Sequence, residues 1–562
     1  MKGRSLTVAC VLALIVSVSL VGIISTGVTR AQTEAVLVIA QQSDPGILNN
    51  IVGDTLGSFI VHHMVWSELL NLGYDGQSIL PDLAKSWDVS SDGLNYTFHL
   101  RTGVKWHDGT PFTADDVKFT FDTAIALPTW AIAYLETINR ITVNDPYNVT
   151  FTLNARDAAF LTLLAFGSNF GLNILPKHLY EGTNISTNAH NFNPIGTGPF
   201  KFSSHITGQS LTLVANLDYW GGRPPMDRIV IKIIPNSATA ALELQAGTVQ
   251  YLVTFDNPIP FSDLGPIARS AGVTVSNPTG GVITWLLFNT NDPVAGNATL
   301  RQAIGYAVNR SELAEKAYFN YAKAMDGFYL EGSWLNVDAR LAYDPTKATQ
   351  LLDQLGYTPG TGGVRLTVEF AFHPLFGMDV EAQVLKEQLA KVGIALTFWS
   401  GDYPTWFDKV HTRGQYQIAL RASQIGPDPS LMWHWLDPNH VGESGSTFFN
   451  STVMTNLFLS ARESTDQAAR HSMYNQVQQI LHDNVPVLPL TNIEDVNLWR
   501  SDMVKNVGPE VGTLRWDVSK AEPVGSGAPS SSSLPLYAGV AVAVIALAAI
   551  LGFVWRRRKT RT

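Results

Sequence analysis

The chain is almost free of cysteine. Among its 562 residues only Cys10 carries a thiol, and it lies in an apolar stretch close to the N-terminus. Every residue after that stretch therefore belongs to a body with no disulfide bond and no thiolate ligand for a metal. The same absence excludes the paired cysteines of thiol redox enzymes.

Motifs of common enzyme classes are missing as well. The sequence has no H-E-x-x-H and no G-x-S-x-G, and Gly196-Thr197-Gly198 lacks both the lysine and the third glycine of nucleotide-binding loops. We interpret these glycines as a tight backbone crossing between two domains. No repeat of 20–50 residues is present, which argues against a solenoid. The sequence favours a protein that is not an enzyme.

Positive charge is scarce outside the two ends of the chain. Eight of the 38 basic residues lie in those ends, so the body between them carries 30 basic residues against 47 acidic ones. An acidic body of this kind repels phosphate backbones, so we expect no nucleic-acid partner.

Both ends carry long uncharged segments. Residues 1–31 read as a secretory signal, with basic Lys2 and Arg4 before an apolar run and cleavage after Ala31; an uncleaved anchor is the alternative. Residues 536–555 are long enough to cross a bilayer, and the basic tail 556–562 places the C-terminus in the cytoplasm. Residues 521–535, rich in Ser, Pro and Gly, predict an extended stalk. These features predict an extracellular body on a single-pass anchor in the cell membrane.

Six Asn-x-Ser/Thr sequons suit such an exposed body and predict a glycoprotein. They are Asn95, Asn148, Asn184, Asn297, Asn309 and Asn450.

Strand-like and helix-like segments are interspersed, which predicts an α/β protein. About 490 residues between the signal and the stalk exceed one core, so at least two domains are expected. Thr113 caps one expected helix, Asp344-Pro345 opens another that Gly356 closes, and residues 381–392 form a third. The expected strands are 35–40, 229–234, 282–289, 366–372, 394–399 and 417–422.

The segment 81–122 carries the most specific pattern of the chain. A turn at Ser91-Asp92-Gly93 precedes the alternating strand 96–101, and a second turn at Asp108 to Pro111 precedes the capped helix. Its run of residues, W-D-V-S-S-D-G-L-N-Y-T-F-H-L-R-T-G-V-K-W-H-D-G-T-P-F-T-A-D-D-V, resembles the signature of the family 5 solute-binding proteins, the peptide and nickel receptors of ABC importers.

The resemblance implies an α/β, two-lobed, periplasmic-binding-protein-like (Venus flytrap) fold with a third, inserted domain. It assigns residues 34–77, 195–290 and 496–520 to lobe I, 78–194 to the inserted domain and 291–495 to lobe II. It also implies a monomeric receptor without catalysis, cofactor or metal, which binds peptides between the lobes and delivers them to an ABC permease.

Five residues are predicted to contact the ligand. Arg421 matches the arginine with which the family's peptide receptors hold a carboxylate. Asp428 matches either a turn aspartate or the ligand-binding one. Aromatic rings that can pack on a ligand are supplied by Trp433, Trp399 and Trp285.

Three alternatives remain open from the sequence. The tryptophans and nearby neutral hydrogen-bonding residues also suit an oligosaccharide. A nickel receptor would need converging imidazoles, whereas His62, His63, His434 and His440 read as surface or capping residues. An extracellular enzyme on the same α/β body is the third.

Overall fold

The computed structural model describes most of the chain between its two ends. The described residues are 34–525 except 50, 54–55, 74–77, 128–134, 170–171, 254–258, 277–281, 326, 329–333, 337, 425, 427, 433–435, 437–446 and 508–517. The predicted signal, most of the stalk and the predicted membrane helix lie outside these residues. Within the described part, none of the helices combines the length and the apolar character needed to cross a bilayer.

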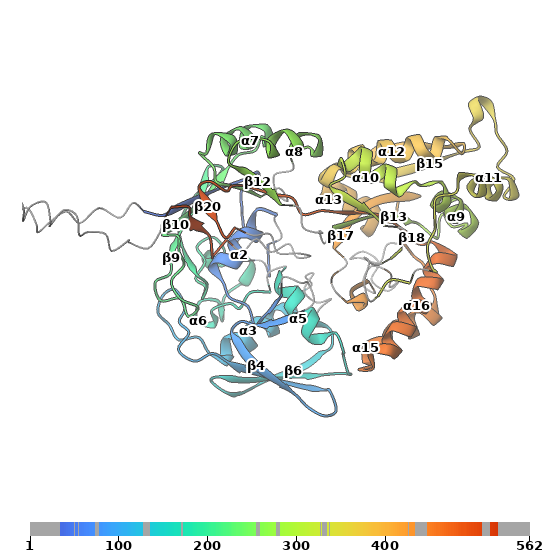
Figure 1. Cartoon of the computed structure of the whole chain (residues 1–562). Helices are drawn as coiled ribbons and strands as arrows, with labels where there is room; N and C mark the ends of the chain where they lie inside the picture. The colour runs from blue at the N-terminus through green and yellow to red at the C-terminus, as the bar shows by residue number, and fades with distance from the viewer. Residues whose placement is uncertain are drawn as a thin grey trace, which may run out of the picture.

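Lobe I is built on a seven-stranded mixed sheet (Figure 1). Strand β1 (Val36–Gln41) runs parallel to β10 (Arg228–Ile233) and to β11 (Tyr251–Val253). The sheet order is β12 (Val273–Ser276), β19 (Asn497–Arg500), β11, β1, β10, β9 (Ser210–Ala215) and β8 (Phe200–Ile206). Helices α7 (Ser237–Ala246) and α8 (Phe261–Ala268) cover one side, and α2 (Phe59–Val65) lies on the other (Figure 1).

Lobe II has its own six-stranded sheet. Its order is β14 (Ala322–Ala324), β18 (Val487–Ile493), β13 (Val282–Phe288), β17 (Ile418–Gln424), β15 (Leu366–Phe372) and β16 (Ile394–Ser400). Its helices are α9 (Ala298–Ala307), α10 (Arg310–Tyr318), α11 (Pro345–Gln354), α12 (Met378–Ala390), α13 (Tyr403–Phe407), α15 (Thr452–Glu463) and α16 (Gln467–Asn484). All six predicted strands and all three predicted helices are thus present, with small shifts at their ends.

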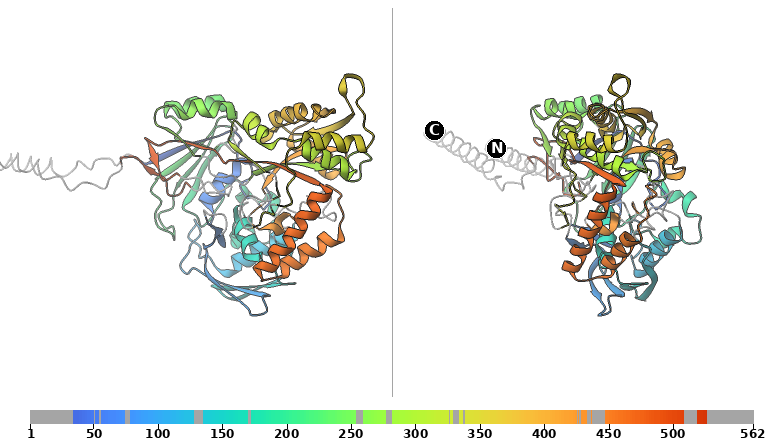
Figure 2. Two further views of the ribbon diagram at one scale, coloured as in Figure 1. Left: turned by 45° about the vertical axis from the view of Figure 1, so that its right-hand side comes forward. Right: turned by 90° about the vertical axis from the view of Figure 1, so that its right-hand side faces the viewer.

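The inserted domain is a four-stranded antiparallel sheet with helices packed on it (Figures 1 and 2). Its strands, in sheet order, are β4 (Ala84–Val89), β5 (Asn95–Leu100), β7 (Asn148–Leu153) and β6 (Ile138–Asp145). Helices α3 (Ala114–Ala126), α5 (Phe160–Asn169) and α6 (Lys177–Tyr180) accompany it, and the hairpin β2 (Leu70–Leu72) and β3 (Ile79–Pro81) joins it to lobe I.

Helix α3 begins where its cap predicted, although its apolar spacing is irregular. Thr113 and Asp116 form a capping box, in which the Asp116 carboxylate accepts a hydrogen bond from the Thr113 amide at 2.9 Å. Each side chain thereby satisfies a backbone donor that a helix start leaves unpaired. Val117 and Phe121, one turn apart, supply its buried side.

Two predicted boundaries are wrong. Strand β13 was placed in lobe I, but it pairs with β17 and β18 in the sheet of lobe II. A continuous apolar run shows that a strand is buried, yet it does not tell which sheet the strand joins. The stalk was expected to start at residue 521, whereas β21 (Glu522–Pro523) pairs with β20 (Val504–Lys505) in the folded body.

The lobes also touch through the inserted domain. Arg462, near the end of α15, donates from Nε to the buried Asp157 carboxylate at 2.9 Å and from Nη1 to Glu136. Its carbonyl accepts a hydrogen bond from the Ala158 amide at 2.8 Å. Because Asp157 and Glu136 belong to the inserted domain, these contacts join the inserted domain to lobe II. They are separate from the covalent link between the lobes, in which the chain passes from β18 to β19.

Gly196 and Gly198 form the tight crossing that the sequence suggested. A Cβ atom on Gly196 would stand 1.9 Å from the carbonyl oxygen of Val65, and one on Gly198 would stand 2.6 Å from that of Met64. The His107 ring fixes this crossing, since its Nδ1 accepts from the Gly196 amide at 3.2 Å and its Nε2 donates to the Gly198 carbonyl at 3.0 Å. The signature region therefore builds the junction between lobe I and the inserted domain.

Gly196→Ala should destabilise the protein by roughly 3 kcal/mol or more, because the added methyl meets backbone atoms that cannot rotate away. Denaturant unfolding of the variant measures this loss. Gly265→Ala is the matched control, since its nearest atom is the end of Arg269 at 3.7 Å. Equal stabilities of the two variants would contradict a forced close approach at Gly196.

A buried carboxyl lies under the strands that enter and leave lobe II. Glu381 of α12 accepts hydrogen bonds from Thr284 of β13 at 2.8 Å and from Tyr318 at 2.9 Å. Thr284 in turn contacts Thr491 of β18 at 2.7 Å. Burial raises the pKa of Glu381 to about 7.

This raised pKa predicts a pH-dependent stability. The neutral acid favours the folded state, so its contribution is full at low pH and is lost as pH rises from the unfolded pKa of about 4.3 through 7. Glu381→Gln keeps a neutral group at every pH. Between pH 5 and 8 the wild type should therefore lose about 2–3 kcal/mol of unfolding free energy relative to this variant. Parallel curves for the two proteins over this range would show that Glu381 does not titrate as described.

Candidate ligand-binding site

The three parallel strands of lobe II end at one edge of its sheet. β15 runs parallel to β16 and β17, with Ala371 opposite both Trp399 and Ala419. This register brings Trp399, His373 and Arg421 to the carboxyl ends of three neighbouring strands. Open α/β sheets bind ligands at such ends, so this edge is the candidate site.

Arg421 is buried and contacts His411. It is 5% exposed, and its Nη1 donates to Nε2 of His411 at 2.8 Å. Burial lowers the pKa of Arg421 to about 10, and the Tyr403 and Tyr416 hydroxyls act in the opposite direction. An arginine in such surroundings suits the carboxylate of a ligand.

His373 and His411 escaped the sequence analysis. Burial, with the charge of Arg421 as a second cause, lowers the pKa of His373 to about 4 and that of His411 well below its usual value. Both rings pack against Trp406, at centroid distances of 4.9 and 5.2 Å. His411 accepts a hydrogen bond from Arg421 and so holds its guanidinium in place. Neither has a sequence signal, because only the fold brings residues 373, 411 and 421 together.

The predicted tryptophans occupy different environments. Trp399 is half-buried at the end of β16, with the Lys409 ammonium 5.1 Å from its ring centroid. Trp285, opposite Arg421 on the adjacent strand, is 1% exposed and packs in the core of lobe II. Its contact with a ligand stays a prediction that requires the ring to become accessible. Trp433 lies outside the described residues.

Asp428 makes a bidentate ion pair within lobe II. Both of its oxygens accept from Arg470 of α16, at 2.9 and 2.8 Å, and the two side chains are 8% and 5% exposed. Its Oδ1 also accepts from the Ser430 amide at 2.9 Å. The sequence left two roles open for Asp428, that of a turn aspartate and that of a ligand-binding one, and these contacts match the first. Ligand binding by Asp428 stays a prediction.

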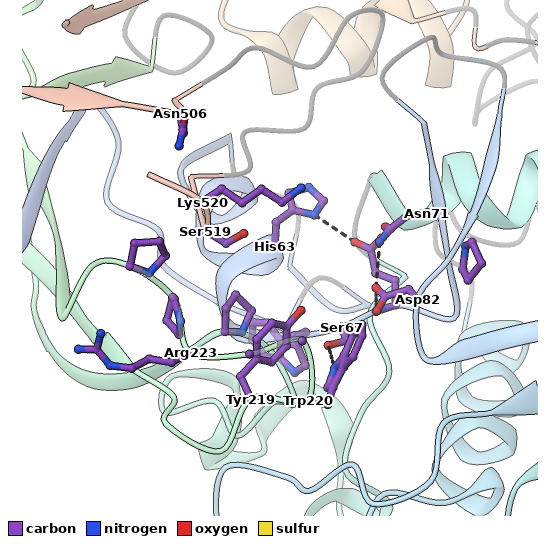
Figure 3. Close-up of a pocket in the computed structure, with 18 of the residues that line it drawn as sticks. His63, Ser67, Asn71, Asp82, Tyr219, Trp220, Arg223, Asn506, Ser519 and Lys520 are labelled. Carbon is purple, nitrogen blue, oxygen red and sulfur yellow. Dashed lines mark hydrogen bonds and ion pairs between the residues drawn. The ribbon is translucent and has the colours of Figure 1, made fainter. Parts of the chain in front are cut away.

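A separate cavity of about 750 Å³ opens on lobe I (Figure 3). It lies between the end of α2, the loop around Tyr219 and Trp220, and the C-terminal residues Ser519 and Lys520. Its walls hold interactions of their own: His63 lies 3.1 Å from Glu68, and Trp220 donates to Ser67 at 3.2 Å. None of the predicted ligand residues lines it, so we keep the candidate site on lobe II.

The described residues offer no metal site: no group of three or more His, Cys, Asp or Glu among them could hold an ion. His62 and His63 were expected on the surface, but both are buried in α2, 1% and 6% exposed. Burial lowers the pKa of His62 to about 3. All seven residues of α2 are buried, so its two histidines are buried with their apolar neighbours. His434 and His440 lie outside the described residues.

Two α/β lobes, joined by crossing strands and carrying an inserted third domain, define a two-lobed binding protein of the periplasmic type. The model of the bacterial extracellular solute-binding proteins, family 5, matches residues 78–443. The chain belongs to this family.

Relatives within the family support the same assignment. The chain is 30% identical over 424 residues to a protein of Brucella ovis whose name places it among ABC transporter peptide-binding proteins, covering 73% of this chain and 78% of the relative. Among solved structures, the periplasmic binding protein DppA of Helicobacter pylori, in complex with the peptide STSA, has 26% identity and a TM-score of 0.74, covering 87% and 98%. NikZ of Campylobacter jejuni, in complex with Ni(L-His), has 26% identity and a TM-score of 0.73, covering 87% and 99%.

Proposed function

We propose that this chain is a membrane-anchored, extracellular substrate-binding protein that captures peptides between its lobes and delivers them to an ABC permease. The observation that carries the peptide assignment is the place of Arg421, a buried arginine at the carboxyl ends of three parallel strands. A peptide carboxylate is the anion that this site fits, because its planar pair of oxygens matches the guanidinium fork.

Capture depends on closure of the lobes. A ligand that touches both lobes stabilises the closed form by its differential affinity for that form. The contacts of Arg462 with Asp157 and Glu136 join lobe II to the inserted domain, so they add to the stability of the closed arrangement. Opening would separate these buried charges and expose them to water.

Arg462→Ala should shift the ligand-free protein toward open forms and weaken ligand binding roughly tenfold, although Arg462 need not touch the ligand. Small-angle scattering measures the opening, and calorimetry with a bound peptide measures the affinity. Arg413→Ala removes a half-exposed arginine whose partner, Asp408, is equally exposed, and serves as the control. An unchanged scattering profile and affinity in Arg462→Ala would contradict a closing role.

Screening the purified full-length protein tests the ligand class. Peptides with free carboxyl termini should raise its melting temperature, because a ligand that binds only the folded state stabilises it. Stabilisation by oligosaccharides instead would favour an oligosaccharide receptor, in which the half-buried ring of Trp399 could pack on a sugar. Turnover of either class would overturn the receptor function and favour an enzyme.

Anchoring at the membrane is tested separately by cell fractionation. The full chain should pellet with membranes, whereas a chain ending before residue 536 should be released outside the cell. Release of the full chain would contradict the predicted anchor without affecting the ligand assignment.

A further inference from the structure

Helix α8 of lobe I meets helix α10 of lobe II beside the crossing between the lobes (Figure 1). The ring of Phe261, the first residue of α8, packs edge-on against that of Tyr318, with centroids 5.2 Å apart, and its centroid lies 6.2 Å from that of Tyr321. The Tyr321 carbonyl accepts a hydrogen bond from the Glu494 amide at 2.9 Å, in the segment that joins β18 to β19. Phe261 is therefore a side chain of lobe I that packs on lobe II next to the hinge.

Tyr318 links this contact to the buried carboxyl beneath the hinge strands. Its side chain is fully buried, and its hydroxyl donates to Glu381 at 2.9 Å. The start of α12, the helix that carries Glu381, lies against both rings, since a Cβ atom on Gly377 would stand 3.4 Å from those of Phe261 and Tyr318. Glu381 also accepts a hydrogen bond from Thr284 of β13, the strand by which the chain enters lobe II. A continuous set of contacts thus runs from lobe I to a hinge strand.

Neutral groups enclose the Glu381 carboxyl. Strands β13 and β18 contain no charged residue, and Thr284 and Thr491, which bond to the carboxyl, are uncharged. The titratable group that faces it is the Tyr318 hydroxyl, and burial raises the pKa of this hydroxyl well above its usual value, so it stays protonated. Charged side chains on the other elements around α12 bind elsewhere: Arg301 to Asn484, Arg310 to Pro489, Glu312 to Lys316, Glu369 to Lys409 and Arg421 to His411. The remaining ones, Glu315 of α10 and Asp379, Lys386 and Glu387 of α12, are exposed.

We infer that closure of the lobes is coupled to protonation of Glu381 through the contact of Phe261 with Tyr318, so that ligand binding takes up a proton from the buffer. This inference rests on the binding function proposed above. With the lobes together, the Phe261 ring shields Tyr318 and, behind it, Glu381. When the lobes separate, the ring moves away with lobe I and water reaches this side of Tyr318. Water favours the carboxylate over the neutral acid, so the neutral acid favours the closed form.

The sign of the pH effect follows from this exposure. In the arrangement with Phe261 in place, burial raises the pKa of Glu381 to about 7, and the hydrogen bonds from its neighbours act in the opposite direction. A group whose pKa is higher in the closed form than in the open form supports closure at low pH, and this support is lost as the pH rises through 7. Peptide affinity should therefore fall roughly three- to tenfold between pH 6 and 8, because a difference of one pKa unit corresponds to a factor of about ten.

Two measurements on the purified full-length protein test the coupling at pH 6, 7 and 8: small-angle scattering without ligand, and calorimetry with tri- and penta-alanine. The wild type should open and lose affinity as the pH rises. Glu381→Gln, which is neutral at every pH, should keep one scattering profile and lack this loss of affinity. Glu387→Gln, which alters an exposed carboxylate of the same helix, should behave like the wild type. Titration of the peptide's own amino group is common to all three proteins and cancels in the comparison.

Phe261→Ala separates coupling across the hinge from a local titration of Glu381. Without the ring, water reaches Tyr318 in both arrangements, so the pH dependence should flatten although Glu381 is intact. Phe192→Ala, which removes an exposed ring of the inserted domain, should retain it. A pH dependence that is absent from the wild type, or that persists in Glu381→Gln or Phe261→Ala, overturns the coupling while the receptor function stands. A wild type that binds no peptide at any pH overturns the peptide function, and the scattering profiles then decide the coupling by themselves.

Discussion

Arg421→Ala should weaken the binding of peptides with a free carboxyl terminus by about 1.5–3 kcal/mol, which is roughly 10–150-fold. The reason is the loss of a charge-assisted fork from a guanidinium that is buried beside His411. Peptides with an amidated C-terminus lack the anion, so their weaker affinity should be the same in the variant and the wild type. Calorimetry with each peptide pair measures the difference.

The control for this experiment is again Arg413→Ala, which removes an arginine outside the site. The melting temperature of Arg421→Ala without ligand shows whether this variant is folded. It should stay close to that of the wild type, because the substitution also removes a buried charge. If Arg421→Ala weakens amidated and free peptides equally, Arg421 supports the site without binding the carboxylate.

Asp428→Ala should lower the free energy of unfolding by about 3–5 kcal/mol, the typical cost of leaving one partner of a buried ion pair alone. Arg470, which is 4% exposed, would lose its carboxylate partner. The loss should be far larger than that of Asp408→Ala, which breaks a half-exposed pair with Arg413 and should cost less than about 1 kcal/mol. Denaturant unfolding of both variants gives the comparison.

Replacing Arg470 as well discriminates between the two roles of Asp428. In Asp428→Ala with Arg470→Met the uncompensated charge is gone, so part of the lost stability should return. If Asp428→Ala instead keeps its stability and loses affinity for peptides, Asp428 acts on the ligand and the pair with Arg470 contributes little.

Local patterns in the sequence were sufficient for most elements of the fold. Alternation placed β5, and the Thr113 cap placed α3 although Val117, Phe119 and Phe121 fit a helical period poorly. The lobe to which β13 belongs was not predictable, because both lobes offer a sheet that can bury a fully apolar strand. The signature region predicted the family, but its residues, such as His107, build a domain junction and not the candidate site.

The candidate site was predicted only in part. Arg421 was predicted from its match to the family's arginine, and the structure adds His373 and His411, which no spacing links to it. Trp285 is 1% exposed in the core of lobe II, and its contact with a ligand stays a prediction.

Native mass spectrometry of the purified full-length protein, mixed with a peptide library and then denatured, tests the central claim most directly. The account predicts one non-covalently held peptide per chain, released with its mass unchanged. A protein that retains no peptide, or that releases cleaved products, would contradict the account.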